Sequence, residues 1–381
     1  MKPMLRILEI CCDLDGGGSD RYVYNYCTRI NDIHFDYSAV DNRKGILEPL
    51  LEAEGSLVFH VPQIKSGPIK YYRLLKSHIL SGNYDAVHIH LGHKSFIASI
   101  AAKRCDVRTR IVHAHIAFVP ENMIQRIIRQ ICTKITIHSA THLAACGVDA
   151  AKWVWGEKAY NDGKVKVLNN AIETKKYKYN HNLRTIMRKE LGLQDNQIVV
   201  GHVGRLSDQK NQLRLLEIFA EMLKLQSDAM LIMIGQGEME KEVQEKINEL
   251  NISDNVKMLG IRNDVAELLN IMDVFVFPSK YEGLPFTLIE TQCNGLRCIC
   301  SDTITPLVDV TGAIRFISLL DSNKDWAEKA FEEIRKGRID RAEQKIIEAC
   351  YDIDVEAKKL EKYYIDCIKR QEKSVEKRFG R

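Results

Sequence analysis

The feature that most constrains the fold of this chain is a rhythm of short apolar runs, each followed by a turn and a helical pattern. The runs lie at 4–10, 35–40, 57–61, 84–90, 110–116, 142–146 and 165–168, and then at 197–204, 229–235, 256–260, 274–278 and 297–301. Helical patterns such as 71–80 and 96–105 separate them. Apolar strands that alternate with helices indicate parallel sheets covered on both faces.

The rhythm is interrupted once, by a polar and basic stretch at 169–182 that we expect to be an interdomain linker. A chain of 381 residues is long for one domain and suits two. We therefore predict an α/β protein of two doubly wound, Rossmann-like domains, 1–173 and 174–354, that face each other across a cleft. A last helix at about 355–381 is expected to pack back on the first domain. In sheets of this kind ligands bind beyond the carboxyl ends of the strands.

Composition narrows the class of protein. Hydrophobic residues make up 45% and charged residues 28%, and the net charge of +4 is too small to indicate nucleic acid by itself. No run approaches the roughly 18 apolar residues of a membrane span, and we interpret the apolar N-terminal stretch as a first buried strand rather than a secretion signal. The 11 cysteines form no C-x-x-C pair, so they indicate neither a zinc site nor a disulfide framework. The expected location is the cytoplasm.

The segment 124–138 carries four basic residues and no acid. It is either a helix with one solvated face or a basic amphipathic surface that rests on anionic lipid. The second interpretation adds peripheral contact with the inner face of the cytoplasmic membrane.

Three glycines, Gly16 to Gly18, stand between the first apolar run and the first helical pattern. Glycines before a helix let backbone N–H groups approach an anion at the helix N-terminus. A dinucleotide fingerprint would need a third glycine where Arg21 stands, although Asp41 could serve as its acid at the end of the second strand. A tight turn without a ligand is the other alternative.

The first strand of the second unit ends at Gly204, and Arg205 and Lys210 flank the turn that follows. Two cations beside a helix N-terminus suit a diphosphate, because the helix dipole, the arginine fork and the lysine charge all favour an anion. Solvated surface cations are the alternative.

Glu282 and Glu290 lie eight positions apart, across a strand-to-helix turn shaped by Gly283 and Pro285. Carboxylates accept hydrogen bonds in pairs, which suits the vicinal hydroxyls of a sugar or ribose. Like charges repel, so these acids cannot bind the diphosphate itself. We expect them to bind hydroxyls on either side of a diphosphate held by Arg205 and Lys210.

The stretches 165–172, 201–212, 235–243 and 260–303 together resemble the retaining glycosyltransferases of family 4, which have the GT-B fold. The resemblance is nearest to the bacterial exopolysaccharide and capsule branch, and it is densest from Gly201 to Thr303. It implies that 1–173 is the acceptor-side domain and 174–354 the nucleotide-sugar domain.

The resemblance also implies roles for individual residues. Glu282 would contact the donor sugar and Glu290 the ribose, while Arg205 and Lys210 hold the diphosphate. The loop with Gly17 and Gly18 would close over the phosphate. The expected donor and nucleotide pocket is completed by Gly204, Gly235, Gly237, Arg262, Asp264, Gly283, Leu284, Thr287 and Leu288.

A first-domain histidine is expected to face the donor sugar in such enzymes. Here "VHAHIAF" offers His113 and His115, where the family commonly has Ser or Thr, any residue, then His. Histidines at i and i+2 on a strand share a face. We predict His115, nearer the carboxyl end, with His113 and His90 as alternatives. Two further departures are Asp20, where the family usually has the longer acid, and Asn169, where it often has proline.

The resulting prediction is a retaining, metal-independent hexosyltransferase. It would move a sugar from a nucleotide diphosphate sugar, expected to be a UDP-sugar, to a lipid-linked or glycan acceptor in cell-surface polysaccharide synthesis. No Asp-x-Asp or histidine cluster lies in the loops with Arg205, Lys210 and Glu282, where Mg²⁺ could bridge the phosphates, and no cofactor is expected. A nucleotide-sugar epimerase of similar fold and a non-catalytic partner subunit are the alternatives.

Overall fold

The computed structural model describes residues 4–116 and 121–379. The chain forms two compact units, each with its own parallel sheet. The first unit holds residues 1–171 and 353–381, and the second holds 172–352.

The sheet of the first unit is doubly wound, with strand order β3-β2-β1-β4-β5-β6-β7 within the described residues. Its strands are β1 (Leu5–Cys11), β2 (Ile33–Ala39), β3 (Val58–His60), β4 (Ala86–Ile89), β5 (Thr109–Ala114), β6 (His142–Ala145) and β7 (Val165–Val167). All neighbouring pairs are parallel. The central strands are buried on both faces, as expected of a doubly covered parallel sheet.

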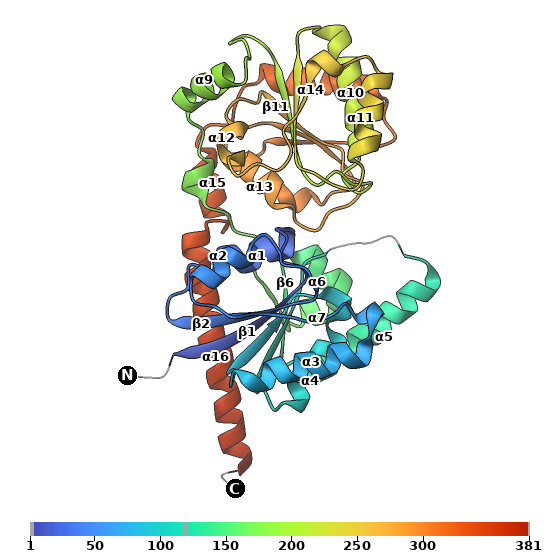
Figure 1. Ribbon diagram of the computed structural model, residues 1–381. Coiled ribbons are helices and arrows are strands. Elements are labelled where there is room, and N and C mark those ends of the chain that lie inside the picture. The colour runs from blue at the N-terminus through green and yellow to red at the C-terminus, as the bar shows by residue number, and fades with distance from the viewer. Residues whose placement is uncertain (1–3, 117–120, 380–381) are drawn as a thin grey trace. The chain divides into compact units, whose positions relative to one another are not determined.

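The helices of the first unit are α1 (Gly18–Cys27), α2 (Glu48–Ala53), α3 (Pro68–Ser81), α4 (Ser95–Arg104), α5 (Met123–Ser139), α6 (Val148–Trp155), α7 (Glu157–Asn161) and α16 (Ile353–Phe379). Short 3₁₀ turns lie at Ile64–Ser66 and Gly92–Lys94. The helices α3, α4 and α5 pack on one another on one face of the sheet. On the other face α16 packs on α1, so that the C-terminal helix belongs to this unit (Figure 1).

The sheet of the second unit has the order β10-β9-β8-β11-β12-β13 within the described residues. Its strands are β8 (Val199–Val203), β9 (Met230–Ile234), β10 (Val256–Met258), β11 (Val274–Phe277), β12 (Cys298–Ser301) and β13 (Ile314–Ile317). Its helices are α8 (Thr174–Tyr177), α9 (His181–Glu190), α10 (Gln212–Leu225), α11 (Glu240–Glu249), α12 (Val265–Leu269), α13 (Phe286–Cys293), α14 (Asn323–Arg335) and α15 (Ala342–Glu348). Short 3₁₀ turns lie at Ser253–Asn255 and Pro306–Val308.

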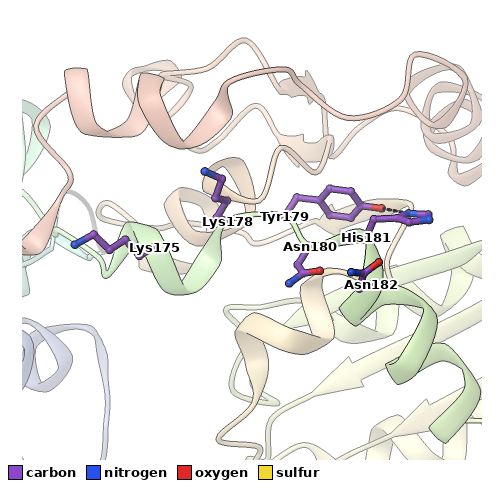
Figure 2. Close-up of a pocket in the computed structure, with 6 residues that line it drawn as sticks. All are labelled: Lys175, Lys178, Tyr179, Asn180, His181 and Asn182. Atoms are coloured by element: carbon purple, nitrogen blue, oxygen red, sulfur yellow. Dashed lines mark hydrogen bonds between the residues drawn. The ribbon is translucent and has the colours of Figure 1, made fainter.

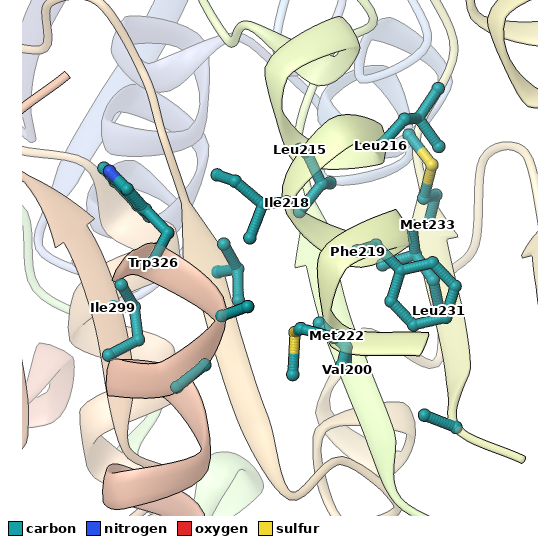
Figure 3. Close-up of a cluster of buried hydrophobic side chains, with 14 of the residues drawn as sticks. Val200, Leu215, Leu216, Ile218, Phe219, Met222, Leu231, Met233, Ile299 and Trp326 are labelled. Atoms are coloured by element: carbon teal, nitrogen blue, oxygen red, sulfur yellow. The ribbon is translucent and has the colours of Figure 1, made fainter. Parts of the chain in front are cut away.

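The core of the second unit lies between its sheet and the helices α10 and α14 (Figure 3). Phe219 of α10 and Trp326 of α14 are fully buried there, in the same cluster as Ile299 of β12. The central strand β8 includes Gly201, where an added Cβ would lie 2.0 Å from the sulfur of Met272. Close packing of this kind holds β8 and the loop after it in place.

The structure differs from the sequence-based expectations in two places. The stretch 169–182 is not a plain linker, because it contains α8 and the start of α9, and Thr174 is buried with its hydroxyl bonded to Asp352. Strand β13 was not predicted at all. Its pattern, buried at both ends and half-buried between, carries a weaker apolar signal than the central strands.

Candidate functional site

Most of the predicted donor residues lie in the second unit, in or next to loops that leave the carboxyl edge of its sheet. From β8 the chain moves outward to β9 on one side, and later enters β11 on the other side of β8. Loops that leave neighbouring strands in opposite directions open a crevice at this switch point, which is the usual ligand position in such folds.

Two glycines let the loop after β9 lie directly against the loop after β8. An added Cβ at Gly235 would lie 2.1 Å from the carbonyl oxygen of Gly204, and one at Gly237 would lie 2.1 Å from that of Leu206. Gly235 also has a φ of +132°, a conformation that favours glycine. The backbone N–H of Leu206 donates to the oxygen of Gln236 over 3.1 Å. The chain therefore needs both glycines for this contact.

The loop after β11 is attached to the other side of the β8 loop. The N–H of Lys280 donates to the oxygen of Gln209 over 2.8 Å, and the Gln209 amide donates to the oxygen of Tyr281 over 2.9 Å. The Asn211 amide donates to the oxygen of Pro278 over 3.1 Å. These bonds place the residues between 205 and 210 beside those between 279 and 283.

Lys210 and Glu282 form the central ion pair of these loops. Lys210 Nζ lies 2.6 Å from Glu282 Oε1 and 4.7 Å from the centre of the Phe277 ring. The side chains of Lys210 and Glu282 are only 16% and 8% exposed. A charge pair shielded from water in this way interacts much more strongly than one in solvent. The pair puts a cation and an acceptor carboxylate side by side at the switch point.

Arg205 extends from the same loop and is exposed. Its Nε donates to Glu238 Oε2 over 2.9 Å, with 72% and 58% of the two side chains exposed. The backbone N–H of Glu238 lowers the pKa of that carboxyl, and Arg205 adds to the effect. Such a surface pair is weak and can exchange partners at little cost.

Glu290 lies in the second turn of α13 and is 3% exposed. Its Oε1 accepts a hydrogen bond of 2.8 Å from the hydroxyl of Tyr177 in α8. The stretch that was expected to be a linker therefore supplies a partner to a predicted site residue. This contact could not be predicted from the sequence, because the two residues are 113 positions apart in the chain.

The remaining predicted donor residues of the second unit differ in position and in exposure. In the loop after β10, Arg262 forms a 2.8 Å bond with Asp264, which lowers the pKa of that carboxyl. Gly283 and Thr287 are partly exposed. Leu288 is fully buried and its N–H bonds to the oxygen of Pro285, so its side chain is part of the core.

In the first unit, Gly17 is the N-cap and Gly18 the first residue of α1, at the end of the loop after β1. An added Cβ at Gly18 would meet nothing within 4 Å, and one at Gly17 would meet only the Asp20 carboxylate at 3.5 Å. The fold itself therefore does not require glycine at either position. Asp20 is buried below them, and burial together with Asp13 raises its pKa to about 8.

His115 follows the last residue of β5 and is half-buried, whereas His113 and His90 are 0% and 3% exposed. His115 Nε2 lies 2.8 Å from His90 Nδ1, and His90 Nε2 lies 2.7 Å from Glu9 Oε2. Burial lowers the pKa of His90 to about 4 and that of His115 well below its usual value. Of the three predicted candidates, only His115 reaches partial exposure at a strand end.

Comparison with known proteins shows a similarity to glycosyltransferases. Residues 184–349 match the model of glycosyl transferases group 1, and this range contains the ion pair, Arg205 and Glu290. The chain is 29% identical over 340 residues to the putative glycosyltransferase EpsF of Bacillus subtilis, which covers 87% of this chain and 88% of that one.

One further relative is similar in sequence, and one solved structure is similar in fold. Over 240 residues the chain is 30% identical to a UDP-Gal:alpha-D-GlcNAc-diphosphoundecaprenol alpha-1,3-galactosyltransferase of Escherichia coli, covering 61% of each chain. The Anabaena protein Alr3699/HepE, in its complex with UDP and glucose, has the same fold with a TM-score of 0.79. That alignment covers 94% of this chain and 99% of the other at 18% identity. The two-domain GT-B fold expected from the sequence is confirmed.

A polar hollow of about 410 Å³ elsewhere in the second unit is separate from these residues (Figure 2). It is lined by Lys175, Lys178, Tyr179, Asn180, His181 and Asn182. The Tyr179 hydroxyl lies 3.4 Å from His181 Nδ1 across it. None of the predicted donor residues lines this hollow, so we assign it no part in the reaction.

Proposed function

We propose that this glycosyltransferase moves a hexose from a UDP-sugar to a lipid-linked or glycan acceptor, with retention of the anomeric configuration. The observation that carries the proposal is the shielded pair of Lys210 and Glu282 at the switch point between β8 and β11. A cation for phosphate and a carboxylate for sugar hydroxyls are adjacent there, as the junction of a nucleotide sugar requires.

The roles of the donor residues follow from this junction. Lys210 and Arg205 neutralise the diphosphate, and Arg205 leaves Glu238 for the phosphate at little cost because that pair is exposed. Glu282 accepts hydrogen bonds from the donor sugar. Glu290, oriented by Tyr177, accepts those of the ribose. The backbone at Gly235 and Gly237, with Arg262 and Asp264, lines the base and ribose pocket.

The first unit contributes two groups to the proposal. Gly17 and Gly18 leave open space at the start of α1, so that backbone N–H groups can approach a phosphate closely. His115 faces the donor sugar from the end of β5. Glu9 and His90 act behind it as positioning residues.

In the proposed reaction the departing UDP carries the developing negative charge. Lys210 and Arg205 stabilise that charge in the transition state, which is where such contacts accelerate a reaction. The acceptor hydroxyl attacks from the same face that the nucleotide leaves, and its proton passes to the departing phosphate. Because two side-chain cations are available, the proposal includes no metal ion at the diphosphate.

The acceptor and pathway are inferred from relatives. EpsF, the capsular polysaccharide glycosyltransferase CapH of Staphylococcus aureus and the amylovoran glycosyltransferase AmsD of Erwinia amylovora carry names from polysaccharide synthesis. The Escherichia coli relative is named for a diphosphoundecaprenol acceptor. We extend this acceptor class, a sugar on a lipid diphosphate, to the present chain.

Contact with the membrane is proposed through α5. None of the helices that the structure describes is long and apolar enough to cross a bilayer. The exposed side of α5 nevertheless carries an apolar stripe of Met123, Ile124, Ile127, Ile128, Ile131 and Ile135, each at least 36% exposed. Its buried side holds small polar residues such as Thr133 and Thr136. Arg129 bonds to Glu121, so fewer charges face outward than the sequence suggested, and insertion of the apolar stripe is the larger contribution.

The experiment that tests the proposed function is a screen of nucleotide sugars for thermal stabilisation, followed by a transfer assay on the hit. A stabilising UDP-sugar whose sugar reaches a lipid diphosphate acceptor supports the proposal. Conversion of the donor without any acceptor would favour an epimerase instead.

A further inference from the structure

The first unit contains a buried group of imidazoles that the proposed reaction does not use in full. Glu9 of β1 is the register partner of His88 in β4, and His88 is followed at i+2 by His90. His113 of β5 projects to the same face, because Ile111 is the partner of His88. We call His88, His90 and His113 the histidine cluster. The helices α1 and α16 cover it, with the Tyr22 ring centre 4.7 Å from that of His113.

The hydrogen bonds around the cluster determine which ring nitrogens keep a lone pair. The Tyr364 hydroxyl donates its one proton to Glu9 Oε1 over 2.9 Å, so His88 Nδ1 must donate to that hydroxyl over 2.7 Å. His90 Nε2 donates to Glu9 Oε2 over 2.7 Å. His88 therefore keeps its lone pair on Nε2 and His90 on Nδ1. Both imidazoles are oriented from behind by an oxygen atom, that of Tyr364 for His88 and that of Glu9 for His90.

Several nitrogens of the cluster have no protein partner within the described residues. His88 Nε2 and both ring nitrogens of His113 are buried and have no hydrogen-bond partner. The side chains of His88 and His113 are 0% exposed, and that of His90 is 3% exposed. Buried polar atoms are almost always satisfied, so a set of them in one place indicates a bound species that supplies the missing interactions. One ring nitrogen from each of the three histidines lies within 4.8 Å of the others.

We propose that His88, His90 and His113 bind a divalent cation of the zinc type. Three neutral imidazoles are a common ligand set for zinc, which accepts a water molecule as a fourth ligand. A second shell in which the far nitrogen of each ligand is held by a carboxylate or hydroxyl is typical of such sites, and Glu9 and Tyr364 provide it for His90 and His88. His113 can turn its ring toward the ion without losing a hydrogen bond.

The site would tie β1, β4 and β5 to the C-terminal helix α16 through Tyr364. It would also affect His115, because the His90 nitrogen that carries the lone pair is the one to which His115 donates. Cation binding at that nitrogen would release His115 from His90. This inference concerns a cation inside the first unit and is independent of the donor loops of the second unit.

The test uses the full chain purified without a histidine tag. Metal content is measured by mass spectrometry before and after dialysis against a chelator, and then after return of Zn²⁺ alone. The expected result is about one zinc per chain that His113→Leu and His88→Gln lose. His142→Gln removes a half-buried histidine elsewhere in the same unit and should keep the zinc. Glu9→Gln should weaken Zn²⁺ binding about 10- to 100-fold.

Thermal unfolding gives a second measurement that does not depend on retained metal. If the cluster binds zinc, chelation lowers the melting temperature of the wild type but leaves that of His113→Leu unchanged. If it binds none, His113→Leu removes two unsatisfied buried nitrogens and is neutral or stabilising, and chelation changes neither protein. Wild-type protein that contains no zinc and takes up none, or that binds it equally after His113→Leu, would overturn the proposal.

Discussion

Lys210 Nζ donates to Glu282 Oε1 over 2.6 Å, although 72 residues separate the two along the chain. The bond joins the loop after β8 to the loop after β11. In the proposed complex the phosphate competes for the lysine and the sugar hydroxyls compete for the glutamate, so we expect donor binding to weaken this bond.

Removal of the diphosphate cations is the first prediction. Lys210→Ala and Arg205→Ala should each weaken UDP binding and slow transfer, with a rate loss of about 10²–10³ for the more important cation. Binding is measured by calorimetry and transfer by initial rates. Lys280→Ala, which removes a half-exposed lysine paired with Asp208 in the neighbouring loop, is the matched control and should be near wild type. Near-normal turnover of the Lys210→Ala, Arg205→Ala double variant would refute the diphosphate assignment.

The shielded ion pair gives a second prediction, about stability. Lys210→Met leaves Glu282 without its partner at 8% exposure, so it should lower the melting temperature. The double variant Lys210→Met, Glu282→Gln should recover part of the loss, because no unpaired charge remains. A double-mutant cycle on denaturant unfolding measures the coupling. Additive effects of the two changes would mean that the pair contributes nothing to the fold.

The third prediction concerns metal at the diphosphate. Transfer should persist in excess EDTA during a short assay, and added Mg²⁺ or Mn²⁺ should leave the rate unchanged, because Lys210 and Arg205 supply the positive charge. Loss of activity that Mg²⁺ or Mn²⁺ restores would contradict it. The proposed zinc-type site is tested separately by metal content.

The fourth prediction concerns α5. The wild type should sediment with anionic vesicles, and Ile127→Glu with Ile131→Glu should abolish this by placing charge in the exposed apolar stripe. Leu320→Glu, at a residue 95% exposed in the second unit, is the matched control and should bind as the wild type does. Moderate salt should weaken binding only in part, since apolar insertion contributes most. Absence of binding at every salt concentration would mean that α5 is an ordinary helix with one solvated face.

Much of the fold can be predicted from the sequence, because the central strands of each sheet are apolar runs between turns. β13 does not, because its residues are partly exposed. The basic residues of α5 led to a prediction based on charge. The structure shows that the isoleucines between them form an exposed apolar stripe. The histidine cluster required the strand order β1-β4-β5, which places Glu9 beside His88; the repeats "VHIH" and "VHAH" were the only local signal.

The sequence was sufficient to place the predicted donor residues in loops at strand ends. It was not sufficient to predict which residues contact them. Tyr177 contacts Glu290 across 113 positions, from a stretch whose polar composition resembles a linker. Leu288 lies in the same helix as Glu290, and helical geometry turns its side chain into the core, so its contact with the donor stays a prediction.

The measurement that tests the account most directly is UDP affinity and donor turnover, determined on Glu290→Ala and Glu282→Ala. UDP contains the ribose but no sugar, so Glu290→Ala should weaken UDP binding about ten- to hundredfold through loss of a charge-assisted hydrogen bond. Glu282→Ala should leave UDP affinity nearly intact while it lowers turnover of the full donor. Tyr177→Phe, which removes only the hydroxyl that holds Glu290, should have a smaller effect in the same direction as Glu290→Ala. Equal losses of UDP affinity in the two glutamate variants, or no loss of either property in both, would contradict the proposed site.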